Sequence, residues 1–251
     1  MGKIIAVVNQ KGGVGKTTTA VNLTAALHDL GLKILLVDFD PQANATSGLG
    51  VEKRHTKNSV YDVVINGVPA DSAIVKTAYG DVLPSHPDLA GAGVELLNMP
   101  SPNYQLSAAL NQIRDRYDLI FIDCPPSLEL LTLNGLCAAD SILVPVQCEY
   151  YALEGLSDLM STLRAVKRKL NPKLEIFGVA LTMFDGRTNF STQVAQEVRR
   201  HFPGKVFTTA VPRNIRLAEA PSHGIPVTAY DRSSRGAGAY KAMAEEIRNK
   251  L

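Results

Sequence analysis

The sequence predicts an α/β fold of the doubly wound kind, in which a mostly parallel β-sheet carries helices on both faces. Short apolar, β-branched runs alternate with amphipathic segments along the whole chain, which is the pattern of repeated βαβ units. The 251 residues, of which 45% are hydrophobic and 20% charged, suffice for one such domain with an ample core. We therefore expect a single domain over residues 1–251.

The expected elements follow from these patterns and from the residues that end them. The first strand is expected at Lys3–Val8, and the first helix at Lys16–Leu30, where Gly31 ends it. The stretch Leu49–Pro102 shows only short helical turns with Gly and Pro breaks, so its elements are not assigned. The other expected strands are Lys33–Val37, Leu119–Ile122, Ser141–Val146 and Ile176–Thr182, and the other expected helices are Tyr151–Leu170, Phe190–His201 and Gly238–Leu251.

A glycine-rich turn lies between the first strand and the first helix. Its glycines let the backbone curl so that successive N–H groups and the helix N-terminus face an anion. Lys16 can reach the β and γ phosphates of a nucleotide, and the Thr17 hydroxyl can bind Mg²⁺. The usual pattern G-x-x-x-x-G-K-[ST] is not met, since Gln10 occupies the first glycine position and Lys11 follows it. The sequence predicts a phosphate-binding loop formed by Lys11, Gly12, Gly13, Val14, Gly15, Lys16, Thr17 and Thr18.

Carboxylates end two of the expected strands. The run from Asp118 to Asp123 is an apolar strand that ends in an acid, the arrangement in which a P-loop enzyme holds Mg²⁺ directly or through water. The second strand runs into Asp38 and Asp40, and alternation along an extended chain places both on the same side. We expect both side chains to face the phosphates. No N-K-x-D guanine motif occurs in the chain, which favours adenine as the base.

Composition excludes several other classes. No apolar run approaches the ~20 residues that a membrane span needs, and no signal peptide is present, so a cytoplasmic protein is expected. Three cysteines without close-pair spacing suggest neither a disulfide framework nor a zinc site. Residues 1–150 carry 10 Lys and Arg against 15 Asp and Glu, whereas residues 151–251 carry 16 against 9. The C-terminal part is therefore the basic one.

Five segments in order resemble the ParA/Soj chromosome-partitioning ATPases of the deviant Walker A (ParA/MinD) superfamily. They are K-G-G-x-G-K-[ST] at Lys11–Thr17, D-x-D-P-Q at Asp38–Gln42, I-D-C-P-P-S from Ile122, the run Pro145–Gly155, and the segment Pro212–Pro221. The resemblance covers nearly the whole chain. It implies a P-loop fold, ATP and Mg²⁺ as cofactors, and ATP hydrolysis.

The resemblance also implies residue roles. Lys11 would cross a dimer interface to the partner's nucleotide and neutralise phosphate charge, as an arginine finger does. Asp40 would orient or deprotonate the attacking water, which makes Lys11, Lys16 and Asp40 the catalytic residues. Thr17, Asp123 and Asp38 would hold or support the metal. Pro212 and Asn214 would contact the adenine, with Met183 packed beside it.

The implied cycle has three partners. ATP drives formation of a homodimer, the dimer binds double-stranded DNA without sequence preference, and a ParB/Spo0J-type protein stimulates hydrolysis and release. The protein would then be cytoplasmic and associated with the nucleoid. Sequence-independent binding needs only basic side chains over phosphates, which the C-terminal part supplies. The candidate DNA-binding residues are Arg187, Arg216, Arg235 and Lys241.

Two alternatives have the same fold. A cargo-positioning ATPase that moves over the nucleoid would carry the same motifs. A MinD-like ATPase that cycles on membranes would need a basic amphipathic anchor near its C-terminus, whereas Ala242–Leu251 includes Glu245 and Glu246 among a few apolar residues. We therefore expect no membrane partner.

Overall fold

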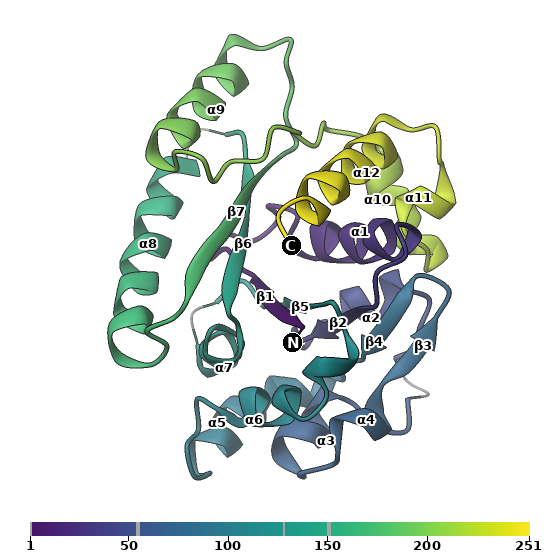
Figure 1. Cartoon of the computed structure of the whole chain (residues 1–251), viewed down its shortest axis with the longest axis vertical. Helices are drawn as coiled ribbons and strands as arrows, with labels where there is room; N and C mark the ends of the chain where they lie inside the picture. Colours follow the sequence, from purple (N-terminus) through teal and green to yellow (C-terminus); the bar gives the residue numbers. More distant parts are fainter. Residues whose placement is uncertain (1, 54–55, 128, 150–151) are drawn as a thin grey trace.

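In the computed structural model of the chain, one β-sheet runs through the centre and helices cover both of its faces (Figure 1). The structure describes residues 2–53, 56–127, 129–149 and 152–251. Within these ranges the sheet has seven strands in the order β3-β4-β2-β5-β1-β6-β7. The strands are β1 (Lys3–Val7), β2 (Ile34–Asp38), β3 (Val75–Thr77), β4 (Gly80–Leu83), β5 (Leu119–Asp123), β6 (Ser141–Gln147) and β7 (Glu175–Thr182).

Every neighbouring strand pair is parallel except β3 and β4, which are antiparallel. Parallel strands require crossover connections, and helices provide them here. The α/β fold class with a mostly parallel sheet is confirmed. The predicted strands all exist, with ends that differ from the prediction by one residue.

The longer helices also match the predictions, and their bounds are α1 (Lys16–Asp29), α8 (Ala152–Lys169), α9 (Asn189–His201) and α12 (Arg235–Arg248). Helix α12 begins three residues before the predicted start, because the Ser234 hydroxyl caps it by accepting a hydrogen bond from the Ala237 N–H. Tyr151, the predicted start of α8, lies outside the described residues.

The remaining helices are shorter, and the sequence patterns did not assign them. They are α2 (Asn44–Gly48), α3 (Val60–Ile65), α4 (Ala70–Ala73), α5 (Ala92–Leu97), α6 (Gln105–Asn111), α7 (Leu130–Ala138), α10 (Arg216–Glu219) and α11 (Val227–Tyr230), with single 3₁₀ turns at Pro87–Ala90, Arg114–Arg116 and Ala220–His223. The unassigned stretch Leu49–Pro102 thus supplies an edge of the sheet, β3 and β4, together with α3, α4 and α5.

Alternation along the central strands divides the core into two layers. Ile5 and Val7 of β1 pack in one buried cluster with side chains of α1, α11 and α12, whereas Ile4 and Ala6 pack in the other with side chains of α3 and α5–α9. Figure 1 shows α1 and α12 side by side over the first face, and α8 over the second. All the residues of β2 and β5 are buried, as expected for parallel strands covered on both faces.

Cys124, Cys137 and Cys148 are free and buried. Among the described residues, no helix is both long enough and apolar enough to cross a bilayer.

Candidate functional site

The predicted motifs meet at one edge of the sheet. In the register, Val7 at the end of β1 pairs with Asp123 at the end of β5, and Asp123 pairs in turn with Asp38 at the end of β2. The carboxyl ends of these parallel strands therefore bring the glycine-rich loop and both strand-end acids together. This edge is where ligands bind in open α/β sheets.

Side-chain hydrogen bonds connect the loop after β1 to the neighbouring strands β6 and β7. The Asn9 amide donates to the Pro145 carbonyl oxygen of β6 at 2.8 Å, and its oxygen accepts from the Lys11 N–H at 3.0 Å. The Thr182 hydroxyl of β7 donates to the Val14 carbonyl oxygen at 2.8 Å. Gly13 and Gly15 have φ values of 75° and 88°, a conformation that favours glycine. The backbone thus forms a fixed cradle that leads into the N-terminus of α1.

Lys16, the first residue of α1, lies inside this cradle. It is only 7% exposed, and its ammonium group donates to the Lys11 carbonyl oxygen at 3.1 Å. Burial lowers its pKa, while the carboxylates of Asp123 and Asp40 oppose this change. A buried ammonium with one carbonyl partner still has hydrogen-bond donors for a phosphate.

Asp123 has the features of a metal ligand. It is fully buried, and in the described parts of the chain neither of its carboxylate oxygens accepts a hydrogen bond of good geometry, although the Thr17 hydroxyl lies close enough to lower its pKa. Burial raises its pKa well above the usual value, and the charge of Asp38 adds to this rise, whereas Thr17 and Lys16 lower it. A buried carboxylate without partners is costly unless a cation neutralises it. Asp123 and the Thr17 hydroxyl, hard oxygen donors, therefore fit Mg²⁺.

Asp38 is also fully buried, but its carboxylate has partners. Oδ2 accepts hydrogen bonds from the backbone N–H and the hydroxyl of Thr46, both at 2.7 Å, and Oδ1 accepts from the Asp40 N–H at 3.3 Å. Burial raises the pKa of Asp38 to about 6, against these hydrogen bonds. The Thr46 contacts fix this acid beside Asp123, which suits it to support a metal ligand.

The expectation that Asp38 and Asp40 both face the phosphates stays a prediction. Strand β2 ends at Asp38, so Asp40 lies in the turn that follows and not in the same extended segment. It is partly exposed, and its Oδ1 accepts from the Gln42 N–H at 2.9 Å. Asp40 still lies near Lys16, because its charge opposes the lowering of the Lys16 pKa.

A cavity of about 440 Å³ lies next to the cradle. Three predicted base contacts, Met183, Pro212 and Asn214, line it together with Gly15 and Thr18 at the start of α1. Met183 has a φ of 50°, an uncommon value for a residue other than glycine, and such values cluster at ligand sites. The cavity is mostly apolar with few polar groups, which suits a planar base that continues from phosphates in the cradle.

Comparison with known proteins decides the family. The family described as "AAA domain" matches residues 2–176. The sporulation initiation inhibitor protein Soj of Bacillus subtilis is 54% identical over 98% of this chain and 98% of its own length. The chromosome partitioning protein ParA of Myxococcus xanthus is 51% identical over 98% of this chain and 88% of its own length. This chain belongs to the ParA/Soj family of chromosome-partitioning ATPases.

A solved structure agrees with this assignment. Cobyrinic acid a,c-diamide synthase from Mycobacterium smegmatis, with bound ATP analog and magnesium, has a TM-score of 0.86 to this fold at 36% identity, covering 99% of this chain and 95% of that chain. The Soj and ParA relatives confirm the ParA/Soj resemblance of the five sequence motifs, and this structure confirms the fold. Of those motifs, Pro145–Gly155 contains Tyr150 and Tyr151, which lie outside the described residues.

The Lys11 side chain pairs with an acidic side chain of its own chain. Its ammonium nitrogen lies 3.8 Å from Oε2 of Glu149, and the two side chains are 35% and 46% exposed. Lys11 thus lies at the rim of the cradle, and Lys16 lies inside it.

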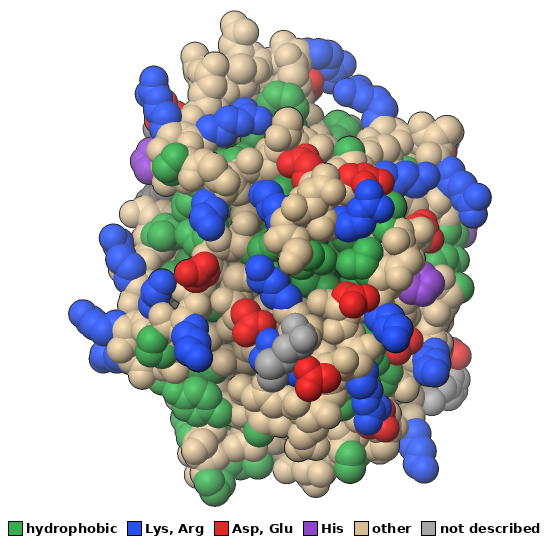
Figure 2. Space-filling view, in the orientation of Figure 1, with side chains coloured by type: hydrophobic (Ala, Val, Ile, Leu, Met, Phe, Trp, Pro, Cys, Tyr) green, Lys and Arg blue, Asp and Glu red, His purple; other side chains and the backbone are tan. Residues whose placement is uncertain are grey.

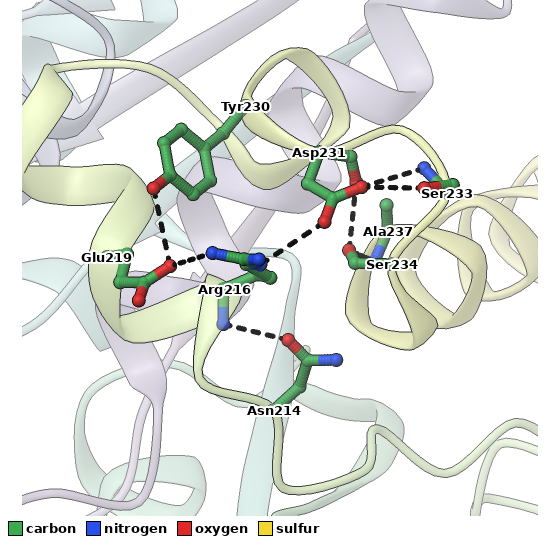
Figure 3. Close-up of polar contacts among 8 residues, drawn as sticks. All are labelled: Asn214, Arg216, Glu219, Tyr230, Asp231, Ser233, Ser234 and Ala237. Carbon is green, nitrogen blue, oxygen red and sulfur yellow. Dashed lines mark hydrogen bonds and ion pairs between the residues drawn. The ribbon is translucent and has the colours of Figure 1, made fainter.

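Arg216 belongs to an ion-pair network beside the cavity (Figure 3). Its guanidinium lies 2.7 Å from Glu219 and 3.3 Å from Asp231, and its backbone N–H donates to the Asn214 side chain at 2.9 Å. Tyr230 donates to the same Glu219 carboxylate at 3.3 Å. The network ties helix α10, which lines the cavity, to the turn before α12.

All four DNA-binding candidates, Arg216 included, are exposed. Arg187 makes a bidentate pair with Asp185 at 2.9 and 2.8 Å, and Arg235 is close enough to help lower the pKa of that carboxyl. Lys241 lies further along α12. On the face drawn in Figure 2, Lys and Arg side chains are interspersed with Asp and Glu and do not form one patch.

Sequence reasoning missed the residues that support the site. Thr46 is one, because a buried threonine in a short helix carries no recognisable motif. Asn9, just before the predicted loop, is another: its side-chain amide donates to Pro145 and its side-chain oxygen accepts from Lys11. Thr182 ends a predicted strand, and that position was the available signal for it.

Proposed function

We propose that this chain, as one domain over residues 1–251, hydrolyses ATP to ADP and phosphate with Mg²⁺ and acts as a nucleotide-dependent switch in DNA segregation. One observation carries the proposal. The glycine-rich cradle, the buried carboxylate of Asp123 and the apolar cavity lie together at one edge of the sheet, where Gly15 and Thr18 belong to both the cradle and the lining of the cavity. The family membership and the solved neighbour with an ATP analog and magnesium support it.

The residues divide the work of phosphoryl transfer, which depends on positioning and on neutralising charge. Backbone N–H groups of the cradle and the Lys16 ammonium bind the β and γ phosphates. The adenine occupies the cavity against Met183, with Pro212 and Asn214 at its edge. Mg²⁺, held by Thr17 and Asp123 with Asp38 in support, would neutralise charge on the phosphate oxygens. Asp40, which is partly exposed and near Lys16, orients the attacking water.

The switch is the nucleotide-dependent homodimer. Lys11 of each protomer would reach the phosphates bound by the partner, so two nucleotides become part of one interface. Its position at the rim of the cradle, 35% exposed, supports this role, because a buried lysine could not reach across. Hydrolysis removes the γ phosphate and so weakens the dimer.

The dimer binds double-stranded DNA without sequence preference, and a ParB/Spo0J-type protein stimulates hydrolysis and release. Arg187, Arg235 and Lys241 are exposed, and Arg216 lies on the segment between the cavity and α12. Arg187 and Arg216 are each paired with acidic side chains of the same chain, so one protomer offers a weak site. Two weak sites on one body raise the effective concentration of the second contact. Such binding would place the protein on the nucleoid.

Asp40→Ala tests the enzymatic part. ATP should bind and the dimer should persist, because this carboxylate acts on water and not on the nucleotide, while phosphate release should stop. Lys11→Ala is the matched variant, in which each monomer still binds ATP but does not dimerise. Size-exclusion chromatography with ATP and a phosphate-release assay measure both. Hydrolysis at the parental rate in the Asp40 variant would remove Asp40 from its role.

A retardation assay on several unrelated duplexes, at two salt concentrations and with ATP or ADP, tests the DNA part. Binding should require ATP, ignore sequence and weaken steeply with salt, because each neutralised phosphate releases counterions. Arg187→Glu should weaken all duplexes alike and leave dimerisation unchanged. Equal binding with ADP would count against a DNA switch.

Two further experiments test the alternative functions. Sedimentation with liposomes would reveal a membrane-cycling protein. The partner captured with the Asp40→Ala dimer would distinguish DNA segregation from positioning of another cargo.

A further inference from the structure

Glu149 joins two cationic side chains at the rim of the nucleotide cradle. It follows β6, its Oε2 lies 3.8 Å from the Lys11 ammonium, and its Oε1 lies 3.5 Å from the Arg213 guanidinium. The Gln147 amide also donates to Oε1. The three partners come from different segments: the cradle after β1, the end of β6, and the chain that lines the base cavity.

We propose that Glu149 is a positioning residue that holds Lys11 against its own protomer before the dimer forms. The inference rests on the proposed function, in which Lys11 must reach the partner's nucleotide. A lysine that pairs with a carboxylate of its own chain has to leave that pair before it can cross the interface. The pair therefore favours the monomer.

The strength of this contact suits a restraint that a nucleotide can release. The side chains of Lys11 and Glu149 are 35% and 46% exposed, and their nitrogen and oxygen are near the limit for an ion pair. Such pairs contribute little and are screened by salt. A triphosphate carries several negative charges and can displace a single carboxylate.

Arg213 lowers the free-energy cost of separating Lys11 from Glu149. When Lys11 leaves, Glu149 retains Arg213 and the Gln147 amide, so its carboxylate is not left without partners. Arg213 also lines the base cavity, so it contacts both that cavity and Glu149. Glu149 thus contacts both Lys11 and a residue of the cavity that the nucleotide base would enter.

Glu149→Gln removes the negative charge of this side chain and keeps its size and shape. The glutamine oxygen can still accept from Gln147 and Arg213, but the amide no longer attracts the Lys11 ammonium. Glu175→Gln is the matched control, because Glu175 is an exposed acid at the opposite end of the sheet, at the start of β7. It makes the same change in net charge.

The experiment is sedimentation velocity over a concentration series with saturating ATP and Mg²⁺, in the Asp40→Ala background so that the nucleotide persists. Glu149→Gln should lower the dimer dissociation constant by about 2- to 20-fold, because each of two protomers loses a weak ion pair. The gain should shrink in high salt. Glu175→Gln should leave the constant unchanged, and all three proteins should still bind ATP.

The outcomes separate the two ideas. If the Asp40→Ala protein dimerises and Glu149→Gln leaves the constant unchanged or raises it, the restraint is wrong, and a raised constant would place Glu149 across the interface. If neither protein dimerises with ATP, the proposed switch fails and the restraint fails with it. A tighter dimer from Glu149→Gln alone supports the restraint, since loss of a merely structural contact would weaken the fold and not strengthen association.

Discussion

The buried hydroxyl of Thr46 allows a sharp test of how the strand-end acids are held. It donates to Asp38 at 2.7 Å and accepts from the Ser85 N–H at 3.0 Å. Thr46, Asp38 and Ser85 are all fully buried. Thr46→Val keeps the shape of the side chain but removes both hydrogen bonds.

The expected loss follows from these two contacts. A hydrogen bond to a charged group contributes about 1.5–3 kcal/mol, and a buried N–H left without an acceptor costs about 1–3 kcal/mol. We expect Thr46→Val to lower the free energy of unfolding by about 3–5 kcal/mol. A domain of this kind has about 5–15 kcal/mol in total, so the effect is large.

Thr24→Val is the control. Thr24 is also fully buried, but within the described residues its hydroxyl has no hydrogen-bond partner. Replacing that hydroxyl with a methyl group should leave stability unchanged or raise it. Urea unfolding without nucleotide or Mg²⁺ measures both variants, with far-ultraviolet circular dichroism as the signal because the chain has no tryptophan. If Thr46→Val is as stable as Thr24→Val, the Asp38–Thr46–Ser85 arrangement does not hold this segment.

Three further predictions concern single residues. Lys16→Ala should abolish ATP binding in calorimetry, because the phosphates lose their principal cation while the backbone cradle remains; unchanged affinity would refute the site. Gly178→Ala should destabilise by about 1–3 kcal/mol in thermal unfolding, since the new Cβ would lie 2.5 Å from the buried Phe207 ring. Asp38→Asn should change the pH dependence of the free energy of unfolding, measured without metal or nucleotide. The pKa of Asp38 is about 6 in the folded protein and 3.8 in the unfolded chain. The parent should therefore lose up to about 3 kcal/mol of stability relative to the variant as pH rises through this range. A difference that stays constant between pH 4 and 7 would contradict that pKa.

The sequence identified the elements whose patterns are local. The central strands are continuous apolar runs, so they were predictable. The loop from Lys11 to Thr18 was predictable because its phosphate-binding residues are consecutive in the sequence. Helix α7 was not, because Leu130–Ala138 is apolar on nearly every side and shows no helical period. Its polar residue Asn134 donates to the Pro102 carbonyl oxygen, a partner 32 residues away.

In the candidate site too, residues in local motifs were predictable and contacts between distant segments were not. Lys16, Asp123 and the base-cavity residues were placed by motifs, and the fold brings them together. Asp40 lies two residues beyond the end of β2, and Asp38 is held by Thr46 of α2, a contact that no strand pattern describes. The Lys11–Glu149 contact joins residues 138 positions apart, and no local pattern encodes it.

The burial of Cys124, Cys137 and Cys148 has a practical consequence for following the switch. Their side chains are between 1% and 8% exposed, and burial raises the pKa of each thiol, so little thiolate is available to react. A cysteine introduced on the surface would therefore be the preferred attachment point for a fluorophore in the folded protein. Dimer formation can then be followed by energy transfer between labelled protomers without removing any native thiol.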